Sequence, residues 1–266
     1  MKHNLRVIIV LLLLFLSAQV IGLLVTSKYA GIDKLPLGIE RPEIKEQATS
    51  FIPVFIMVLI ATALGLLLIR FSLFNVWKLW FLLTIFITLT ISFGAFIPEK
   101  IAILMAGTFA LLKVFRNSYI IHNFTELFIY GALATMFVPI FNIFSATILL
   151  LLISVYDYIA VRKTEHMIKM AKFQGENKTF AGLLIPYKKG TAILGGGDIG
   201  FPLMFAAVVM KEMDLGFYNY KTFLIPLAVS LALLALFMYG KDKKFYPAMP
   251  YVTAGCLIGY LILLLL

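Results

Sequence analysis

The sequence predicts an all-α polytopic membrane protein with nine transmembrane helices. Of its 266 residues, 62% are hydrophobic and only 14% are charged, whereas a soluble domain has roughly 45–50% apolar and about 25% charged residues. Apolar runs of about 20 residues, the length that crosses a bilayer as a helix, follow one another along the chain. The expected spans are residues 6–26, 51–69, 77–96, 99–115, 120–138, 141–161, 192–211, 222–239 and 246–265.

The first apolar run follows Lys2 and Arg6, which is the position of a signal peptide. It is longer than the apolar region of a signal peptide, and no small-x-small cleavage site follows it cleanly, so we expect a membrane helix. The whole chain then forms one integral membrane domain. Residues 1–161 would supply helices one to six, residues 162–191 a cytoplasmic loop, and residues 192–266 helices seven to nine.

The chain has 23 Lys and Arg residues against 13 Asp and Glu residues. With nine spans, most of the basic residues fall in the N-terminus and the even-numbered loops, and the loop 162–191 alone carries seven. Cytoplasmic loops carry such an excess, so we expect a cell-membrane protein with a cytoplasmic N-terminus and an extracellular C-terminus. The same rule explains the net positive charge of the chain. We therefore expect no nucleic acid as a partner.

An apolar patch at residues 180–187 interrupts this loop, next to Lys188 and Lys189. Such a patch is typical of an interfacial segment that its lysines anchor. It also fits a mobile strand that pairs with an extended peptide, because addition to a sheet edge is a common mode of peptide recognition. Both interpretations stay open.

Three acids, Asp157, Asp198 and Glu126, fall inside expected spans, where a carboxylate is costly and indicates a function. At 1.5 Å per residue, Asp157 lies roughly 7–8 Å inside the cytoplasmic end of its helix, and Asp198 lies about 9 Å inside the next helix from the same side. Because these helices would be consecutive and antiparallel, the two aspartates lie at matching depth. We interpret Glu126 as a helix-end or interhelical hydrogen-bonding residue, and as the reserve acid if one aspartate is wrong.

Two carboxylates at hydrogen-bonding distance share a proton near neutral pH. The ionised carboxylate takes a proton from water as the water attacks a carbonyl carbon, and the protonated one donates to the carbonyl oxygen. The pair therefore predicts peptide hydrolysis that needs neither a metal nor another cofactor. His3, His122 and His166 are scattered, and none pairs with a cysteine or acid at zinc spacing.

Gly195, Gly196 and Gly197 directly precede Asp198. Residues without side chains let a substrate backbone or a neighbouring helix approach closely, and they weaken the start of the helix. Simple helix packing is the alternative explanation. The glycine string also matches the dinucleotide-binding fingerprint, but we expect no strand before it and no βαβ unit around it.

Pro247, Ala248 and Met249 open the ninth expected span, and Pro250 follows them. Two nearby prolines prevent a regular helix and leave backbone groups unpaired, which is tolerated at membrane depth where the backbone lines a cavity. Prolines are also common at the start of an ordinary helix. The sequence does not separate these two interpretations.

Three short motifs resemble those of one family. Tyr156-Asp157, Gly195-Gly196-Gly197-Asp198 and Pro247-Ala248-Met249 are similar to the YD, GxGD and PAL motifs of presenilins and signal peptide peptidases, which are intramembrane aspartyl proteases. They occur in the family's order and on the expected sixth, seventh and ninth spans. Met249 is a departure, since the family usually has Leu there. The short loops resemble those of archaeal presenilin homologues most.

The resemblance implies an endopeptidase that cleaves single-span membrane-protein substrates within the lipid bilayer. Asp157 and Asp198 would be its catalytic pair. The residues that would bind substrate or shape the active site are Tyr156, Gly195, Gly196, Gly197, Pro247, Ala248 and Met249. We expect activity from the chain alone or as a homo-oligomer, without obligatory accessory subunits.

Two other functions stay open. Prepilin and preflagellin peptidases also carry an aspartate in a GxGD-type motif, but they usually have Lys two residues after it, where this chain has Gly200. A proton-coupled transporter would use the carboxylates as a relay. It predicts repeat symmetry and acids near the bilayer midplane, and we find neither pattern.

Overall fold

The structure is a computed structural model that describes residues 4–42, 46–116, 118–163, 173, 179–187, 190–239 and 246–266. Its long helices are α1 Leu5–Lys28, α2 Phe51–Arg70, α3 Phe74–Gly94, α4 Glu99–Phe115, α5 Tyr119–Phe137, α6 Ile143–Arg162, α8 Gly196–Glu212, α9 Leu224–Tyr239 and α10 Met249–Leu265. Two antiparallel hairpins join them: β1 Lys34–Leu35 with β2 Ile39–Glu40, and β3 Gly182–Tyr187 with β4 Gly190–Gly195.

Six helical segments among the described residues are long and apolar enough to cross a membrane: Leu5–Lys28, Gln47–Arg70, Phe74–Gly94, Tyr119–Ile140, Ile143–Arg162 and Tyr220–Tyr239. The expected count of nine spans is therefore not confirmed. The other three long helices, α4, α8 and α10, have only 17 residues each. Helix α4 also carries Glu99, Lys100 and Lys113, and α8 carries Asp198, which lower their apolar character.

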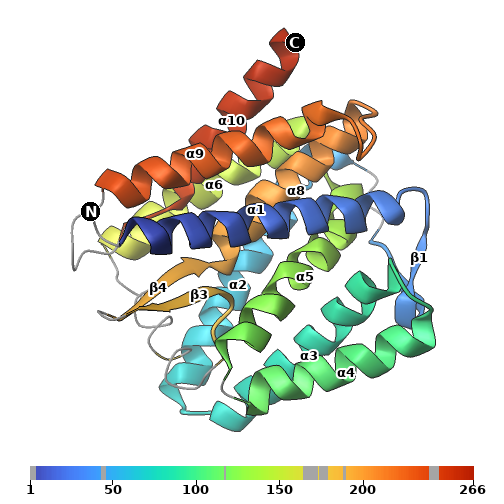
Figure 1. Cartoon of the computed structure of the whole chain (residues 1–266), viewed down its shortest axis with the longest axis vertical. Helices are drawn as coiled ribbons and strands as arrows, with labels where there is room; N and C mark the ends of the chain where they lie inside the picture. Colours follow the sequence, from blue (N-terminus) through green and yellow to red (C-terminus); the bar gives the residue numbers. More distant parts are fainter. Residues whose placement is uncertain are drawn as a thin grey trace.

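Helix α8 lies at the centre of the helical array, where α1, α5, α6, α9 and α10 pack around it (Figure 1). Its residues from Pro202 to Met210 are all buried, and a helix that is apolar on every side belongs in such a position. Gly22 of α1 permits one of these contacts, because a Cβ there would lie 2.2 Å from a methyl carbon of Leu203. Helices α3 and α4 form a separate antiparallel pair, which packs against α5 (Figure 1).

The expected span 192–211 is wrong at its start. Residues up to Gly195 belong to β4, and the helix begins only at Gly196. The backbone of 190–195 instead pairs with β3 in a register from Gly182↔Gly195 to Tyr187↔Gly190, and Gly195 at the end of this strand disfavours extension of the helix into it. A strand does therefore precede the glycine string, contrary to our expectation, but it belongs to an antiparallel hairpin and not to a βαβ unit.

The apolar patch at 180–187 is strand β3 over most of its length. This agrees with the strand interpretation of the patch in its structural part. Much of the expected cytoplasmic loop, including Lys188 and Lys189, lies outside the described residues.

Tyr29 follows the C-terminal end of α1 and forms hydrogen bonds with two other segments of the chain. Its hydroxyl donates to the carbonyl of Ile91 at the end of α3 (2.8 Å), and its own carbonyl accepts from the Arg41 guanidinium beyond β2 (2.6 Å). Burial, with a smaller contribution from the charge of Glu99, raises the pKa of Tyr29 to about 12. The phenol therefore stays a neutral donor at physiological pH.

Candidate active site

Asp157 lies on α6, five residues before the helix ends at Arg162, and its side chain is buried. Its Oδ2 accepts a hydrogen bond of 3.1 Å from the backbone N–H of Met249, the first residue of α10. The backbone N–H of Ala248 also points to this carboxylate. The first N–H groups of a helix have no partner within the helix, so Asp157 satisfies the start of α10 from a different helix.

Asp198 lies on α8, in the third helical position after the N-cap residue Gly195. Its carboxylate reaches back to the backbone N–H of Gly195, as the acidic residue of a capping box does. The space for this contact depends on glycine, because a Cβ at residue 195 would lie 3.2 Å from Asp198 Oδ2. The helix start and the preceding strand thus fix where the carboxylate points.

The two aspartates lie on helices that contact each other and are within electrostatic reach of one another. Helices α6 and α8 pack against each other, and the carboxylates of Asp157 and Asp198 are close enough to repel each other when both are charged. The matching depth of Asp157 and Asp198 along their helices predicted that the two acids would lie close together. The structure brings the start of α10 and the end of β4 to the same place, because each supplies a backbone N–H to one of the acids.

The other expected site residues differ in how closely their surroundings pack against them. Gly196 is confined, since a Cβ there would lie 3.1 Å from Tyr130 Oη and 3.3 Å from the Ala181 carbonyl oxygen, whereas Gly197 is exposed and would tolerate one. Tyr156 packs edge-to-face on Phe55 of α2, with ring centroids 6.5 Å apart.

The proline motif contributes through its backbone. Pro247 and Met249 are buried, and Ala248 is half-buried. Their position at the N-terminus of α10 directs unpaired N–H groups at Asp157. The helix-start interpretation of the prolines agrees with this arrangement: they flank the first residue of α10, and that start faces the candidate catalytic acid.

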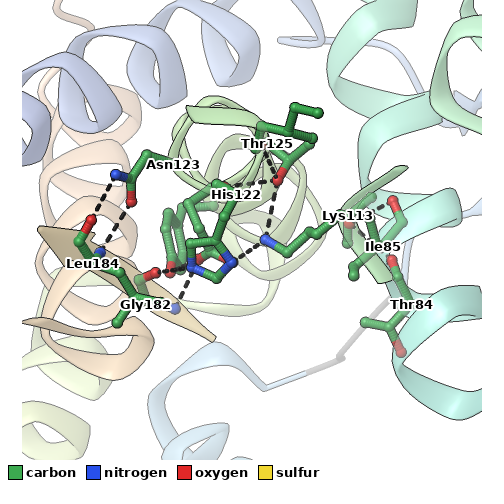
Figure 2. Close-up of polar contacts among 12 residues, drawn as sticks. Thr84, Ile85, Lys113, His122, Asn123, Thr125, Gly182 and Leu184 are labelled. Carbon is green, nitrogen blue, oxygen red and sulfur yellow. Dashed lines mark hydrogen bonds and ion pairs between the residues drawn. The ribbon is translucent and has the colours of Figure 1, made fainter. Parts of the chain in front are cut away.

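Strand β3 is held by side chains of α5, an arrangement that the sequence analysis missed. Figure 2 shows His122 and Asn123 reaching from α5 to the strand backbone. His122 Nε2 lies 2.7 Å from the Gly182 carbonyl oxygen. Asn123 binds Leu184 twice, donating to its carbonyl (2.7 Å) and accepting from its N–H (2.9 Å). The hairpin that leads to Asp198 is therefore fixed from one edge.

Glu126 is part of the same contact. Its carboxylate forms a buried ion pair with Lys113 of α4, and it accepts hydrogen bonds from the Tyr130 hydroxyl and from the Gly182 N–H (2.9 Å). The interhelical hydrogen bond expected of Glu126 is present. A sequence signal for this cluster existed, because His122, Glu126 and Tyr130 follow one another at four-residue spacing and so share a helix face.

Among the residues that the structure describes, no group of three His, Cys, Asp or Glu side chains is placed to hold a metal ion.

The geometry can be compared with known proteins. A family model described as "Signal-peptide peptidase, presenilin aspartyl protease" matches residues 12–266. No curated protein sequence matches the chain. Two solved structures of a presenilin family intramembrane aspartate protease are similar in fold. The form in space group C222 has a TM-score of 0.70 at 18% identity and covers 96% of this chain and 97% of its own. The form in space group P2 has a TM-score of 0.67 at 17% identity and covers 96% of both chains.

Proposed function

Because the chain belongs to the signal-peptide peptidase and presenilin family of aspartyl proteases, we propose that Asp157 and Asp198 are its catalytic dyad. The observation that carries this proposal is that the two acids lie on helices that pack against each other, α6 and α8, within electrostatic reach of one another. Each acid also receives a backbone N–H from an irregular segment, so each is oriented by the fold. The activity is that of an intramembrane aspartyl protease.

The dyad would hydrolyse a peptide bond through a bound water molecule. The ionised carboxylate removes a proton from the water as its oxygen attacks the carbonyl carbon, while the protonated carboxylate donates its proton to the carbonyl oxygen. Collapse of the tetrahedral intermediate breaks the C–N bond, and the amine leaves with a proton from the dyad. The two acids titrate as a unit, so the roles belong to the pair.

Substrate would bind to β4 as an added strand. Residues along an antiparallel strand direct their backbone N–H and C=O groups alternately to either neighbour. Gly182 and Leu184 direct theirs at α5, so Leu183 and Ile185 bond to β4. In the observed register, Thr191 and Ile193 of β4 then point their backbone groups away from β3.

That outward edge of β4 is suited to a peptide. Ile193 is 47% exposed, and β4 has no second strand partner within the described part of the chain. An extended substrate pairing with Ile193 would run toward Asp198, which follows five residues later. Gly197, exposed and without a side chain, lies between the strand and the acid. The substrates would be single-span membrane proteins, whose helix must unwind locally to pair in this way.

The proposed topology supports this use of the site. All nine long helices would lie in the membrane, with the N-terminus cytoplasmic, the C-terminus extracellular, and the dyad toward the cytoplasmic face. The chain would act alone or as a homo-oligomer. Its residues 1–161 and 192–266 supply one catalytic acid each, so they form a single functional unit.

The deciding experiment incubates the purified protein with a single-span substrate in detergent and identifies the products by mass spectrometry. We expect cleavage in the cytoplasmic third of the substrate helix, and no cleavage by Asp157→Asn or Asp198→Asn. Cleavage confined to a prepilin-type leader would instead identify the prepilin peptidase alternative. Proton-coupled uptake into sealed vesicles without peptide products would identify a transporter.

A further inference from the structure

A buried ion pair lies beside the candidate active site without touching either aspartate. The side chains of Lys113 and Glu126 are 0% and 2% exposed, and Lys113 also donates to Thr125 Oγ1 at 3.0 Å. Taking two charges out of water is expensive, and an apolar pair of similar volume is often as stable. The stability of the fold is therefore a weak explanation for this pair, and the second oxygen of Glu126 suggests another.

That second oxygen, Oε2, binds the backbone of β3. It accepts the N–H of Gly182 at 2.9 Å as well as the hydroxyl of Tyr130. Together with His122 and Asn123, it gives α5 a row of polar atoms that occupies the backbone groups of β3 as a neighbouring strand would (Figure 2). Lys113 orients the carboxylate from the side opposite β3.

The position of this contact along the hairpin is specific. Gly182 pairs with Gly195, the last residue of β4 and the N-cap of α8. Gly182 has a φ of +142°, and a Cβ on it would lie 2.2 Å from the Leu194 carbonyl oxygen, so the two backbones meet closely here. Gly196, which follows Gly195 in the chain, donates its N–H to the Ala181 carbonyl at 3.0 Å. Glu126 thus holds the end of the ladder from which Asp198 emerges.

Tyr130 provides a second link to the same turn. It is buried, and a Cβ at Gly196 would lie 3.1 Å from its hydroxyl oxygen and 3.4 Å from its ring. Its hydroxyl group is also within electrostatic reach of Asp198. The hydrogen bond to Glu126 fixes where this hydroxyl lies. It therefore also limits where the backbone at Gly196 can pack.

We propose that Glu126 is a positioning residue, which, through Gly182 and Tyr130, sets the end of the β3–β4 ladder and so the place of Asp198 relative to a peptide bound on β4. This role rests on the proposed function. It differs from the reserve-acid interpretation because Glu126 acts through the strand and the tyrosine and exchanges no proton with substrate. Lys113 neutralises and orients it.

The test compares two double variants that both remove the ion pair. Lys113→Met/Glu126→Gln keeps a neutral oxygen that accepts the Gly182 N–H, whereas Lys113→Met/Glu126→Leu removes the acceptor and leaves an apolar pair. Since neither leaves an unpaired buried charge, both are expected to fold. The measurements are kcat, KM, the thermal unfolding midpoint, and the distribution of cleavage sites on a single-span substrate.

We expect the Gln variant to keep kcat within about threefold of wild type, and the Leu variant to lose roughly tenfold in kcat with little change in KM, because a misplacement of about 1 Å can cost up to about 10²-fold. The Leu variant should also spread its cleavage over neighbouring bonds. Equal kinetics and equal products in the two variants, whether both active or both impaired, would overturn the positioning role.

Tyr130→Phe keeps the test decisive if the Leu variant does not fold. It removes only the hydroxyl, and we expect a several-fold lower kcat with an unchanged KM and unfolding midpoint. A wild-type kcat in Tyr130→Phe would then refute the proposal. Wild type and Asp198→Asn are run beside these variants: a wild-type protein that cleaves nothing refutes the proposed function itself, and the positioning role with it.

Discussion

The backbone N–H of Met249 donates a 3.1 Å hydrogen bond to Asp157, joining residues 92 positions apart in the chain. One turn away, the Ser154 hydroxyl donates to Thr253 Oγ1 at 3.0 Å across the same pair of helices. These two contacts fix α10 against α6 at the depth of the acid. Helix α10 is therefore part of the candidate active site through its backbone. This contact gives a physical reason for the motif Pro247-Ala248-Met249 at its start.

Replacing either aspartate by asparagine should abolish catalysis without unfolding the protein. Asn keeps the shape of the side chain but can neither take up nor deliver the proton, and general acid–base catalysis contributes roughly 10²–10⁴-fold. The check is kcat/KM on a single-span substrate for Asp157→Asn and Asp198→Asn. Asp214→Asn is the matched control, because Asp214 is exposed and has a φ of +50°, which Asn adopts readily. Full activity in either dyad variant would disprove the assignment.

The pH dependence of kcat/KM should be bell-shaped. Activity needs one carboxylate ionised and the other protonated, so it is lost when both are protonated at low pH and when both are ionised at high pH. The profile is measured on wild type, with unfolding followed at each pH to separate inactivation from denaturation. A rate that stays constant across the whole stable range would contradict the shared-proton mechanism.

Blocking the outer edge of β4 should weaken substrate binding. Ile193→Pro removes one outward N–H and leaves the hydrogen bonds to β3 intact, because proline is tolerated on the free side of an edge strand. One lost hydrogen bond of about 1 kcal/mol corresponds to a rise in KM of roughly fivefold. Ile193→Val, which keeps the N–H, is the control. If both variants have the wild-type KM, substrate does not add to this edge.

Filling the contact between α1 and α8 should destabilise the fold. Gly22→Ala places a methyl group against Leu203 and, by overpacking, should lower the free energy of unfolding by about 1–3 kcal/mol. Leu203→Ala alone opens a cavity and should cost about 2–5 kcal/mol, and Gly22→Ala/Leu203→Ala should lose less than the sum of the two single losses, because the clash is absent. Gly107→Ala on α4 is the control, since its Cβ would make an ordinary contact of 3.7 Å with Phe86. Thermal or urea unfolding in one detergent compares wild type, the two single variants, the double variant and the Gly107→Ala control, and an additive double variant would argue against direct contact.

Alkaline pH should reveal the buried Tyr29. Its pKa is raised to about 12 in the folded protein, against about 10 in the unfolded chain. Below pH 10 both states keep the proton, and between pH 10 and 12 only the folded state does, so its stability falls as pH rises through this window. We expect the unfolding midpoint of wild type to fall more steeply there than that of Tyr29→Phe. Parallel curves would show that the phenol does not contribute.

The catalytic candidates could be predicted because their signals are local. Asp157 and Asp198 stand out as acids in apolar runs, and their depth follows from counting residues to the nearest helix end. The proline motif was also visible, although its contact with Asp157 depends on how α6 and α10 pack. Family membership, expected from the three motifs, is confirmed by the match over residues 12–266.

The hairpin before Asp198 could not be predicted from its own sequence. Residues 192–195 are small or apolar and continue into a helix, so a helical span that begins at residue 192 was the simpler expectation. What favours the strand is non-local: the polar side chains of α5 satisfy the outer edge of β3, 60 residues away in the chain. Likewise, nothing in the sequence around Lys113 indicated that Glu126 of the next helix would neutralise it.

The ion pair also has a consequence for how the protein enters the bilayer. Lys113 and Glu126 are 13 residues apart, on consecutive helices joined by a short turn. A helical hairpin of α4 and α5 can therefore bring Lys113 and Glu126 together before either reaches the hydrocarbon, so that these two charges enter as a neutral pair. An isolated α4 would carry the lysine of its last turn without this carboxylate partner. With α4 in the membrane, as in the topology proposed above, the two helices would insert as a unit, and truncation of the chain between them should lower the insertion of α4.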